Sequence, residues 1–369
     1  MSEFRTIREL CSVVVDCPHS TPKWTTSGKI VVRNNNIKHG RIDLSSPSYT
    51  DEEHFAQRIK RAKPQPGDII ITREAPIGDV GMIPENTECC LGQRMVLLRA
   101  DQSVCDNFYL LYSLQSLYVQ HQISWSEGTG TTVSNLRIPH LEQIQIPYLP
   151  IGQQMKISSV LRSLEEKIEN NRKLNDNLQQ QAQAIYSSMF IDNPDPAWSH
   201  GHLSDLITVK YGKDHKKLAD GIYPVYGSGG IMRYVERPLY NKESVLIPRK
   251  GTLNNVMYVN QPFWSVDTMF YTEMKLPNVA KFVYHFVKAK DLASMNAGSA
   301  VPSMTTDILN AMEVVIPSAS ALEEFESLVA PMYEAMEAND VQSKALSQMR
   351  DTLLPKLMSG EIDVSDIQL

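Results

Sequence analysis

The sequence predicts an α+β protein in which two globular mixed α/β domains are separated by two long antiparallel coiled-coil helices. Two observations carry this prediction. Short motifs of the first half return about 170 residues later, and each copy precedes a long stretch with apolar residues three and four positions apart. We therefore predict a globular domain at 1–150, a helix at 151–197, a second globular domain at 198–317, and a second helix with the C-terminal tail at 318–369.

Two pairs of strand-like motifs mark the repeat in the globular segments. Residues 68–73 and 244–249 are short apolar runs that each end in arginine and precede a glycine turn. The dipeptide Ile146-Pro147 returns as Ile316-Pro317, and each copy follows a stretch rich in Gly, Thr and Ser, at 128–136 and 298–306. Apolar runs bounded by Pro, Gly and Asn are typical of strands.

The two helical stretches share one apolar seam. Its positions return at a constant offset of 168 residues, as Leu164, Ile168, Asn171 and Leu178 and then as Met332, Met336, Asn339 and Leu346. Such spacing over four heptads predicts a coiled coil, and two helices that each follow their own globular domain pair most simply antiparallel. A buried Asn pair costs stability but can fix the register. The alternative is a core helix inside one compact domain.

The ends of the second helix carry recognisable signals. Ser320 and Glu323 predict a capping box at its start, and Gly360 predicts its end. Pro331 predicts a kink, or the separation of the first turns from the rest of the helix.

Composition places the chain among ordinary globular proteins. Its 369 residues are 42% hydrophobic and 21% charged, and no stretch approaches the ~20 consecutive apolar residues of a membrane span. Five cysteines without a CxxC pair favour free thiols over a disulfide framework or a zinc site. We expect a cytoplasmic protein without a membrane partner.

The net charge of −6 is unevenly distributed. Residues 200–317 carry 13 basic and 10 acidic side chains, a net charge of +3, whereas residues 318–369 carry 3 and 10, a net charge of −7. Binding to nucleic acid needs a local cluster of Lys and Arg rather than a basic chain as a whole. The pattern therefore permits DNA binding, and it predicts that the acidic final segment faces solvent or a basic patch of a partner.

Several motifs carry a resemblance to a known family. In the globular segments they are PGDIIITR at 66–73, LGQR at 91–94, YPVYGSGGI at 223–231 and PRKGT at 248–252, and near the C-terminus LLPKLMSGEI at 353–362. With these motifs in this order around two long helices, the chain resembles the DNA specificity (S) subunit of Type I restriction-modification systems over essentially its whole length.

This resemblance implies two target-recognition domains, each reading one half of an asymmetric, bipartite target on double-stranded DNA. It also implies a scaffold for two methyltransferase (M) subunits and for endonuclease/translocase (R) subunits. Any S-adenosylmethionine, ATP and Mg²⁺ would then belong to those partners, and this chain would hold no cofactor.

Candidate DNA-binding residues lie beside predicted turns: Arg73, Arg94, Lys213, Lys216, Lys217, Arg249, Lys250, Thr252, Asn254 and Asn255. Arg can bind phosphate or guanine, Lys can bind phosphate, and Asn can read adenine. For the equivalent Arg73 and Arg249, a salt bridge to a neighbouring carboxylate such as Glu74 or Asp267 is an equally open alternative. For Asn254 and Asn255 the alternative is turn chemistry.

Other conspicuous residues have simpler interpretations. The basic run Arg58, Lys60, Arg61 and Lys63 is more typical of a solvated face than of a DNA contact. The scattered Trp24, Trp125, Trp198 and Trp264 are predicted to lie in the core.

Enzyme motifs are missing from the sequence, including a Walker A loop, a G-x-S-x-G elbow and an Asn/Asp-Pro-Pro-aromatic tetrapeptide. We therefore predict no catalytic residue and no metal site. Two further hypotheses remain open at this point: an assembly scaffold whose globular parts bind protein instead of DNA, and an enzyme with an unrecognised nuclease site.

Overall fold

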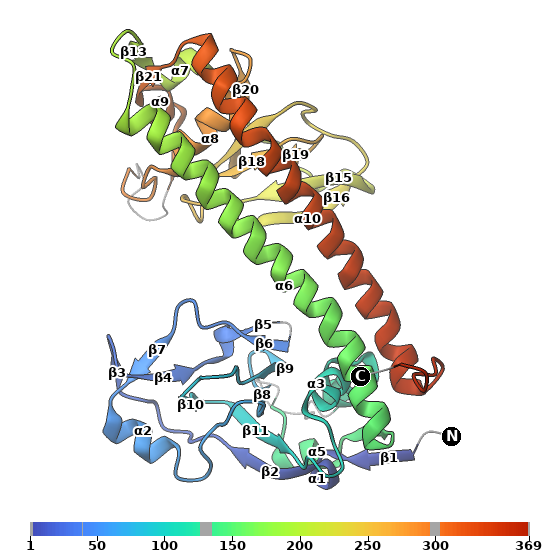
Figure 1. Cartoon of the computed structure of the whole chain (residues 1–369). Helices are drawn as coiled ribbons and strands as arrows, with labels where there is room; N and C mark the ends of the chain where they lie inside the picture. The colour runs from blue at the N-terminus through green and yellow to red at the C-terminus, as the bar shows by residue number, and fades with distance from the viewer. Residues whose placement is uncertain (1–2, 39, 126–134, 296–302, 368–369) are drawn as a thin grey trace. The chain divides into compact units, whose positions relative to one another are not determined.

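The computed structural model describes residues 3–38, 40–125, 135–295 and 303–367 of a mixed α/β chain with two long helices (Figure 1). The chain forms two compact units. Unit 1 comprises residues 1–170 and 341–369, and unit 2 comprises residues 171–340. Most of the two stretches rich in Gly, Thr and Ser lies outside the described residues.

Unit 1 is built around a six-stranded sheet with the order β2-β11-β8-β9-β6-β5. The strands are β2 (Cys11–Asp16), β5 (Ile37–Lys38), β6 (Gly40–Ile42), β8 (Ile69–Arg73), β9 (Ile77–Met82) and β11 (Met95–Ala100). The predicted strand at 68–73 is therefore β8. Its three isoleucines are at most 1% exposed, because β8 lies between β11 and β9 with both faces covered.

A second sheet and several short helices complete the body of unit 1. The sheet has the order β10-β4-β7-β3, with β3 (Trp24–Thr25), β4 (Lys29–Val32), β7 (Ser48–Thr50) and β10 (Cys89–Leu91). The helices are α2 (Glu52–Arg58), α3 (Asn107–Gln115), α4 (Leu117–Trp125) and α5 (Ile138–Gln143), and a 3-10 turn spans Asn34–Asn36.

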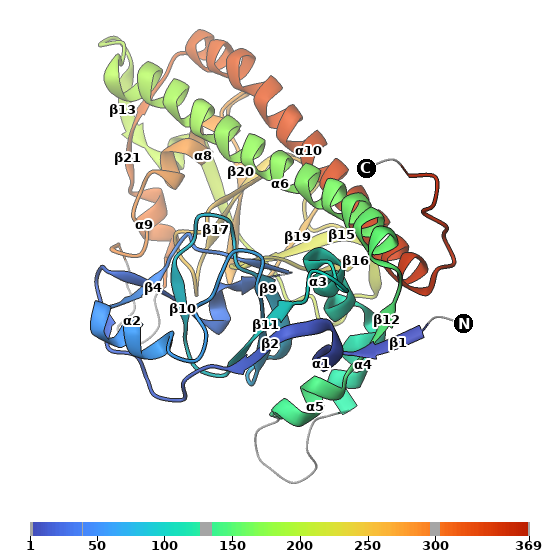
Figure 2. The ribbon, with the colours of Figure 1, turned by 60° about the horizontal axis from the view of Figure 1, so that its bottom comes forward.

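A two-stranded antiparallel clasp closes unit 1, formed by β1 (Glu3–Thr6) and β12 (Gln145–Tyr148) (Figure 2). The next element is α1 (Ile7–Leu10), which begins at a capping box: the backbone N–H of Glu9 donates to the Thr6 hydroxyl at 3.3 Å, and that of Thr6 donates to the Glu9 carboxylate at 2.7 Å. The clasp holds Ile146-Pro147 directly before the first long helix.

Unit 2 repeats this plan with fewer strands. Its main sheet has the order β14-β20-β17-β18, a second sheet has the order β16-β15-β19, and β13 pairs with β21. The strands are β13 (Ser199–His202), β14 (Ile207–Tyr211), β15 (Asp220–Gly227), β16 (Gly230–Val235), β17 (Ser244–Pro248), β18 (Met257–Val259), β19 (Trp264–Ser265), β20 (Met269–Met274) and β21 (Glu313–Ile316). The helices are α7 (Leu203–Leu206), α8 (Ala280–Lys288) and α9 (Thr306–Asn310).

Four strands of each main sheet correspond in their order. In unit 1 the antiparallel run is β2-β11-β8-β9, and in unit 2 it is β14-β20-β17-β18. The clasp of β1 with β12 corresponds to that of β13 with β21, and each clasp closes just before a long helix. The two pairs of motifs in the sequence therefore mark equivalent strands of a repeated fold.

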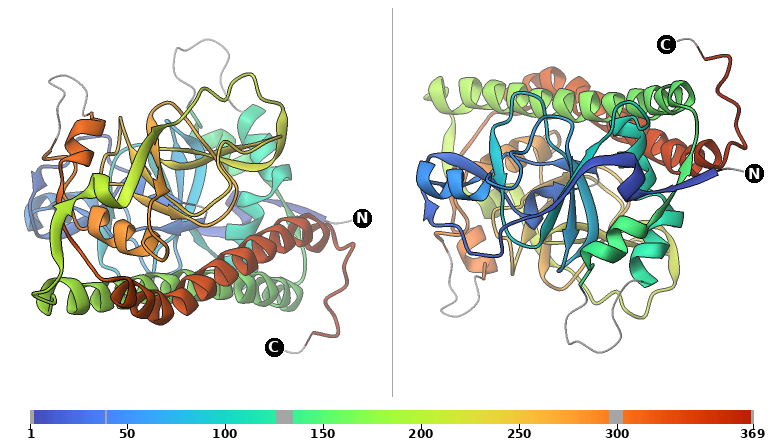
Figure 3. Two further views of the ribbon diagram at one scale, coloured as in Figure 1. Left: turned by 90° about the horizontal axis from the view of Figure 1, so that it is seen from above. Right: turned by 90° about the horizontal axis from the view of Figure 1, so that it is seen from below.

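The long helices are α6 (Ile151–Ser187) and α10 (Ala319–Ser359), and both units contain a part of each. In unit 1, Glu165 of α6 lies 3.5 Å from the Arg350 guanidinium of α10. In unit 2, the Asn175 amide donates to the Asp340 carboxylate at 2.8 Å. Further along α6, Gln183 shares the partner His285 with Tyr333, which lies earlier in α10 than Asp340, so the two helices run antiparallel within unit 2 (Figure 3).

The predicted seam positions Leu164, Ile168, Asn171, Leu178, Met332, Met336, Asn339 and Leu346 are all buried or half-buried. Asn171 is 1% exposed, and its amide donates to the backbone carbonyl of Asn339 at 3.3 Å. The two polar seam residues of the repeat thus meet. None of the helices in the described residues is both long and apolar enough to cross a membrane.

The ends of α10 correct two details of the prediction. The hydroxyl that caps the helix belongs to Ser318, which accepts from the Ala321 N–H at 3.2 Å, and not to Ser320. The helix also continues through Pro331 without a break, so the predicted separation of its first turns is wrong. Gly360 ends the helix as predicted, with the left-handed φ of 75° that glycine adopts readily.

The segment after α10 packs onto unit 1. Val364 is 4% exposed within its core, and Ile362 and Ile367 pack against the same cluster. The acidic residues Glu361, Asp363 and Asp366 are exposed, so the charges of the tail face solvent while the apolar residues between them pack onto unit 1.

His285 on α8 joins both long helices within unit 2. One ring nitrogen lies 2.8 Å from the Gln183 side-chain oxygen of α6, and the other lies 2.9 Å from the Tyr333 hydroxyl of α10. The imidazole is fully buried and stacks on Tyr186 at 5.5 Å. Desolvation lowers the pKa of His285 to about 4, so the ring is neutral in the folded protein.

We predict that acid weakens unit 2 through this residue. An unfolded His has a pKa of about 6.5, so below that pH the unfolded state binds one more proton, and the free energy of unfolding falls by about 1.4 kcal/mol per pH unit until about pH 4. Denaturant unfolding at pH 7 and pH 5 would therefore differ by about 2 kcal/mol from this group alone. In His285→Gln this part of the difference should vanish; an unchanged pH dependence would refute the assignment.

Candidate nucleic-acid interface

Arg73 and Arg249, the two arginines of the repeated motif, have the same pattern of backbone hydrogen bonds, which we call the repeated frame. The Arg73 N–H donates to the carbonyl of Arg94 at 2.8 Å, and the Arg249 N–H donates to that of Thr268 at 2.9 Å. The two arginine carbonyls accept from Leu136 at 3.0 Å and from Met304 at 2.9 Å. The strand ends that carry Arg73 and Arg249 are therefore equivalent in three dimensions as well as in sequence.

In unit 1 the guanidinium of Arg73 is occupied. It lies 2.8 Å from the Asp16 carboxylate and also donates to the Leu136 carbonyl at 2.9 Å and the Asn135 side chain at 3.2 Å. The Arg73 side chain is only 12% exposed. The structure therefore favours the salt-bridge alternative for Arg73, with Asp16 as the partner instead of Glu74.

In unit 2 an aromatic residue replaces that carboxylate. Cys17 and Gly212 donate to equivalent carbonyls, those of Met95 and Met269, so the preceding residues Asp16 and Tyr211 correspond. The Arg249 guanidinium lies 5.3 Å from the centre of the Tyr211 ring, which is 52% exposed. Its hydrogen bond to a backbone carbonyl, that of Asp267, is 3.3 Å long.

A guanidinium that stacks on the face of an aromatic ring keeps its N–H groups free to donate to other acceptors. A guanidinium paired with a carboxylate donates those N–H groups to the carboxylate. Within the described residues, no carboxylate forms a salt bridge with Arg249. Of the two equivalent arginines, Arg249 is therefore the one that can bind a phosphate or a guanine.

The loop after β14 presents the other basic candidates of unit 2. Lys213, Lys216 and Lys217 are exposed, and none of them forms a salt bridge with a described residue. The loop leaves the strand at Gly212, where an added Cβ would lie 2.0 Å from the Val266 carbonyl oxygen, so only glycine fits this close backbone approach.

The loop after β17 divides the remaining candidates. Lys250 and Thr252 are exposed. The Asn254 amide donates to Asp291 at 3.0 Å while its oxygen accepts from the Ala293 N–H at 2.9 Å, and the Asn255 amide donates to the Ser228 carbonyl at 2.8 Å. Both asparagines hold loops together, which favours the turn alternative for them.

In unit 1 the exposed candidate is Arg94. Its backbone has a φ of 64°, and its side chain lies 3.1 Å from Glu74. Arg94 lines an open cleft of about 710 Å³ together with Trp24, Arg33 and Gln93. Trp24 is 46% exposed there and has the Arg33 guanidinium 5.1 Å from its ring centre.

The tryptophan prediction is thus wrong for two of the four residues, since Trp24 and also Trp125, which is 77% exposed, lie at the surface. Trp264 is buried as predicted. No pattern in the sequence indicates this cleft, because its lining comes from loops separated by tens of residues.

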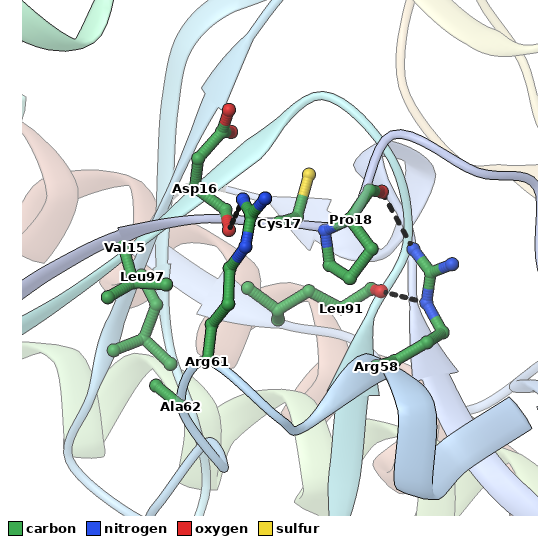
Figure 4. Close-up of a pocket in the computed structure, with 9 residues that line it drawn as sticks. All are labelled: Val15, Asp16, Cys17, Pro18, Arg58, Arg61, Ala62, Leu91 and Leu97. Atoms are coloured by element: carbon green, nitrogen blue, oxygen red, sulfur yellow. Dashed lines mark hydrogen bonds between the residues drawn. The ribbon is translucent and has the colours of Figure 1, made fainter.

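Arg58 belongs to the basic run for which a solvated face and a DNA contact were the two interpretations, and neither of them describes it. It is 6% exposed at the end of α2, and burial lowers its pKa. Its guanidinium donates to backbone carbonyls, including those of Pro18 and Leu91 in Figure 4. In contrast, Arg61 is exposed and makes one bond of 3.4 Å to the Asp16 carbonyl.

The cysteine thiols are buried, and their surroundings disfavour the reactive thiolate. Each of the five cysteines is free and buried, and burial raises the pKa of Cys11 and Cys89 to about 12. In the part of the chain that the structure describes, no group of three or more His, Cys, Asp or Glu residues is placed to hold a metal ion.

Residues 2–180 and 197–325 match a family model described as the Type I restriction modification DNA specificity domain. The chain belongs to this specificity family. The MjaIX specificity subunit of a Type I restriction enzyme from Methanocaldococcus jannaschii is 25% identical over 345 residues, which cover 82% of this chain and 79% of that subunit.

Two proteins of Mycoplasma genitalium are also similar to this chain. A putative Type I specificity subunit, S.MgeORF438P, is 24% identical over 277 residues, covering 67% of this chain and 70% of the relative. The crystal structure of a Type I S subunit from this organism shares the fold with a TM-score of 0.61 at 20% identity, over 97% of this chain and 96% of that chain.

The two arginines of this specificity-family chain should differ in their effect on stability. We predict that Arg73→Gln costs about 3 kcal/mol of unfolding free energy, because it removes the guanidinium from the largely buried Asp16 and leaves only the exposed His19 beside that carboxylate. Arg249→Gln should cost less than about 1 kcal/mol, since it removes one weak bond and one ring contact. Chemical denaturation of both variants measures this, and equal losses would contradict the assignment.

Proposed function

We propose that this chain is the sequence-reading, non-catalytic subunit of a Type I restriction-modification complex. The β-rich part of each unit would read one half of a bipartite DNA target. The observation that carries the proposal is the repeated frame around Arg73 and Arg249: one fold occurs twice, with different side chains at equivalent positions. Two unlike copies of one reader suit two unlike half-sites.

In this proposal α6 and α10 form the antiparallel coiled-coil spacer between the readers. The domains would then be 1–150 and 198–317, with spacer segments at 151–197 and 318–369. The helices begin close to these boundaries, at Ile151 and Ala319, and the contact between Asn171 and Asn339 supports a fixed register.

The same repeat would explain why two copies of one partner subunit bind this chain. Two similar surfaces on one chain can hold two identical subunits, so we propose that two methyltransferase subunits bind this chain and that endonuclease/translocase subunits join them. These partners would supply the S-adenosylmethionine, ATP and Mg²⁺. An assembly scaffold without DNA binding is less well supported, because exposed lysines gather on the loop after β14.

Exchange of one reader tests the proposal. Replacing residues 198–317 by those of a relative should change the methylated sequence in one half-site only, because the other reader and both helices stay the same. Sequencing of DNA methylated by the complex measures this, with an exchange of 1–150 as the reciprocal control. A change in both half-sites after either exchange would show that the readers are not separate.

Arg249 gives a second test. We predict that Arg249→Gln weakens binding to random duplexes and reduces the slope of log affinity against log salt by about 1, as expected for one lost phosphate contact. Arg73→Gln, measured at a temperature where it is folded, should keep the slope of the unmodified chain. If the two variants lost the same slope, or neither lost any, Arg249 would not be the exposed contact.

A further inference from the structure

The cleft of unit 1 has the chemistry of a surface that reads base edges. Its lining combines the cations Arg33 and Arg94, the amide of Gln93, the exposed carboxylate of Asp79 and the Trp24 ring. Base edges present both donors and acceptors, whereas phosphates present acceptors only. A carboxylate in the lining therefore suits contact with bases better than contact with the backbone alone.

Two separate loops contribute to this lining. One follows β2 and leads to Trp24, and the other connects β10 to β11 and carries Gln93 and Arg94. The amide of Gln93 donates to the His19 carbonyl, so the second loop also touches the first. Bidentate recognition of a base tolerates displacements of only about 0.5 Å, so the spacing of the loops matters for specificity.

The buried guanidinium of Arg58 bridges the two loops. It donates to the first loop at the carbonyls of Ser20 and Pro18, at 2.8 and 3.1 Å. It donates to the second loop at the carbonyls of Leu91 and Gly92, at 2.7 and 2.9 Å. Figure 4 shows the bonds to Pro18 and Leu91 arriving at one planar group.

All four acceptors are neutral carbonyls, and they use donors that an arginine holds in a rigid fork. A lysine has three donors on a flexible stem and cannot reproduce this geometry. The guanidinium therefore works as a clip between two loops, and no other residue type supplies the same set of bonds.

We propose that Arg58 is a positioning residue for sequence recognition by unit 1: by clipping the two loops together, it determines which base pairs the cleft accepts in one half-site. This inference rests on the proposed function, because it presupposes that each unit reads one half-site. Arg58 itself is buried and does not touch DNA.

The test uses the full chain in complex with the methyltransferase subunits of its own system and S-adenosylmethionine. The complex methylates a library of duplexes randomised at both half-sites, and sequencing gives the base preference at every position. In Arg58→Met we expect discrimination to fall about 10- to 100-fold at positions of one half-site, the loss expected for a misplaced bidentate contact. The other half-site should keep its preference.

Two variants complete the experiment. Arg58→Lys should relax the same half-site to a smaller extent, and it carries the test if Arg58→Met yields no folded complex. Arg61→Met is the matched control, since Arg61 is exposed three residues further along the chain, and it should leave both preferences unchanged.

The possible outcomes separate the inference from the proposed function. A purely structural role would slow methylation of all sequences equally or relax both half-sites, and either result overturns the inference, as does wild-type preference in Arg58→Lys and Arg58→Met. If the unmodified complex showed no sequence preference at all, the proposed function itself would fail.

Discussion

The structure depends on one constraint: each long helix is buried in two cores. In unit 1, Leu161 of α6 and Leu357 of α10 belong to one apolar cluster, and in unit 2, Tyr186 next to the end of α6 and Phe325 near the start of α10 belong to another. Each core thus needs one part of both helices. Because α10 contributes to both clusters, removal of residues 318–369 would open both cores.

A repeated backbone frame with different occupants is the second theme. Arg73 and Arg249 make equivalent backbone bonds, yet Asp16 faces one and Tyr211 faces the other. One substitution at the neighbouring strand end changes a guanidinium from an internal structural group into an available one. In the proposed function, duplication followed by such exchanges would give two readers of different specificity on the same scaffold.

In unit 1 the exposed polar groups lie elsewhere. Its Arg73 is committed to the fold, and the exposed polar groups lie instead along the cleft with Arg94 and Trp24. The side chains there are held by neighbours, as Arg94 is by Glu74 and as both loops are by Arg58. Preorganised groups lose little conformational entropy on binding, which in the proposed function would favour discrimination between similar DNA sequences.

The sequence alone determined the features that are periodic or local. The seam from Leu164 to Leu346, the strand at 68–73 and the stop at Gly360 follow from spacing and from backbone preferences that act over a few residues. Only the tertiary structure decided the polar partners: Arg73 meets Asp16 across 57 positions, Arg58 turns inward and Trp24 turns outward. The physical reason is that a charged or aromatic side chain is placed by whichever distant segments pack around it, and no local pattern records which segments those are.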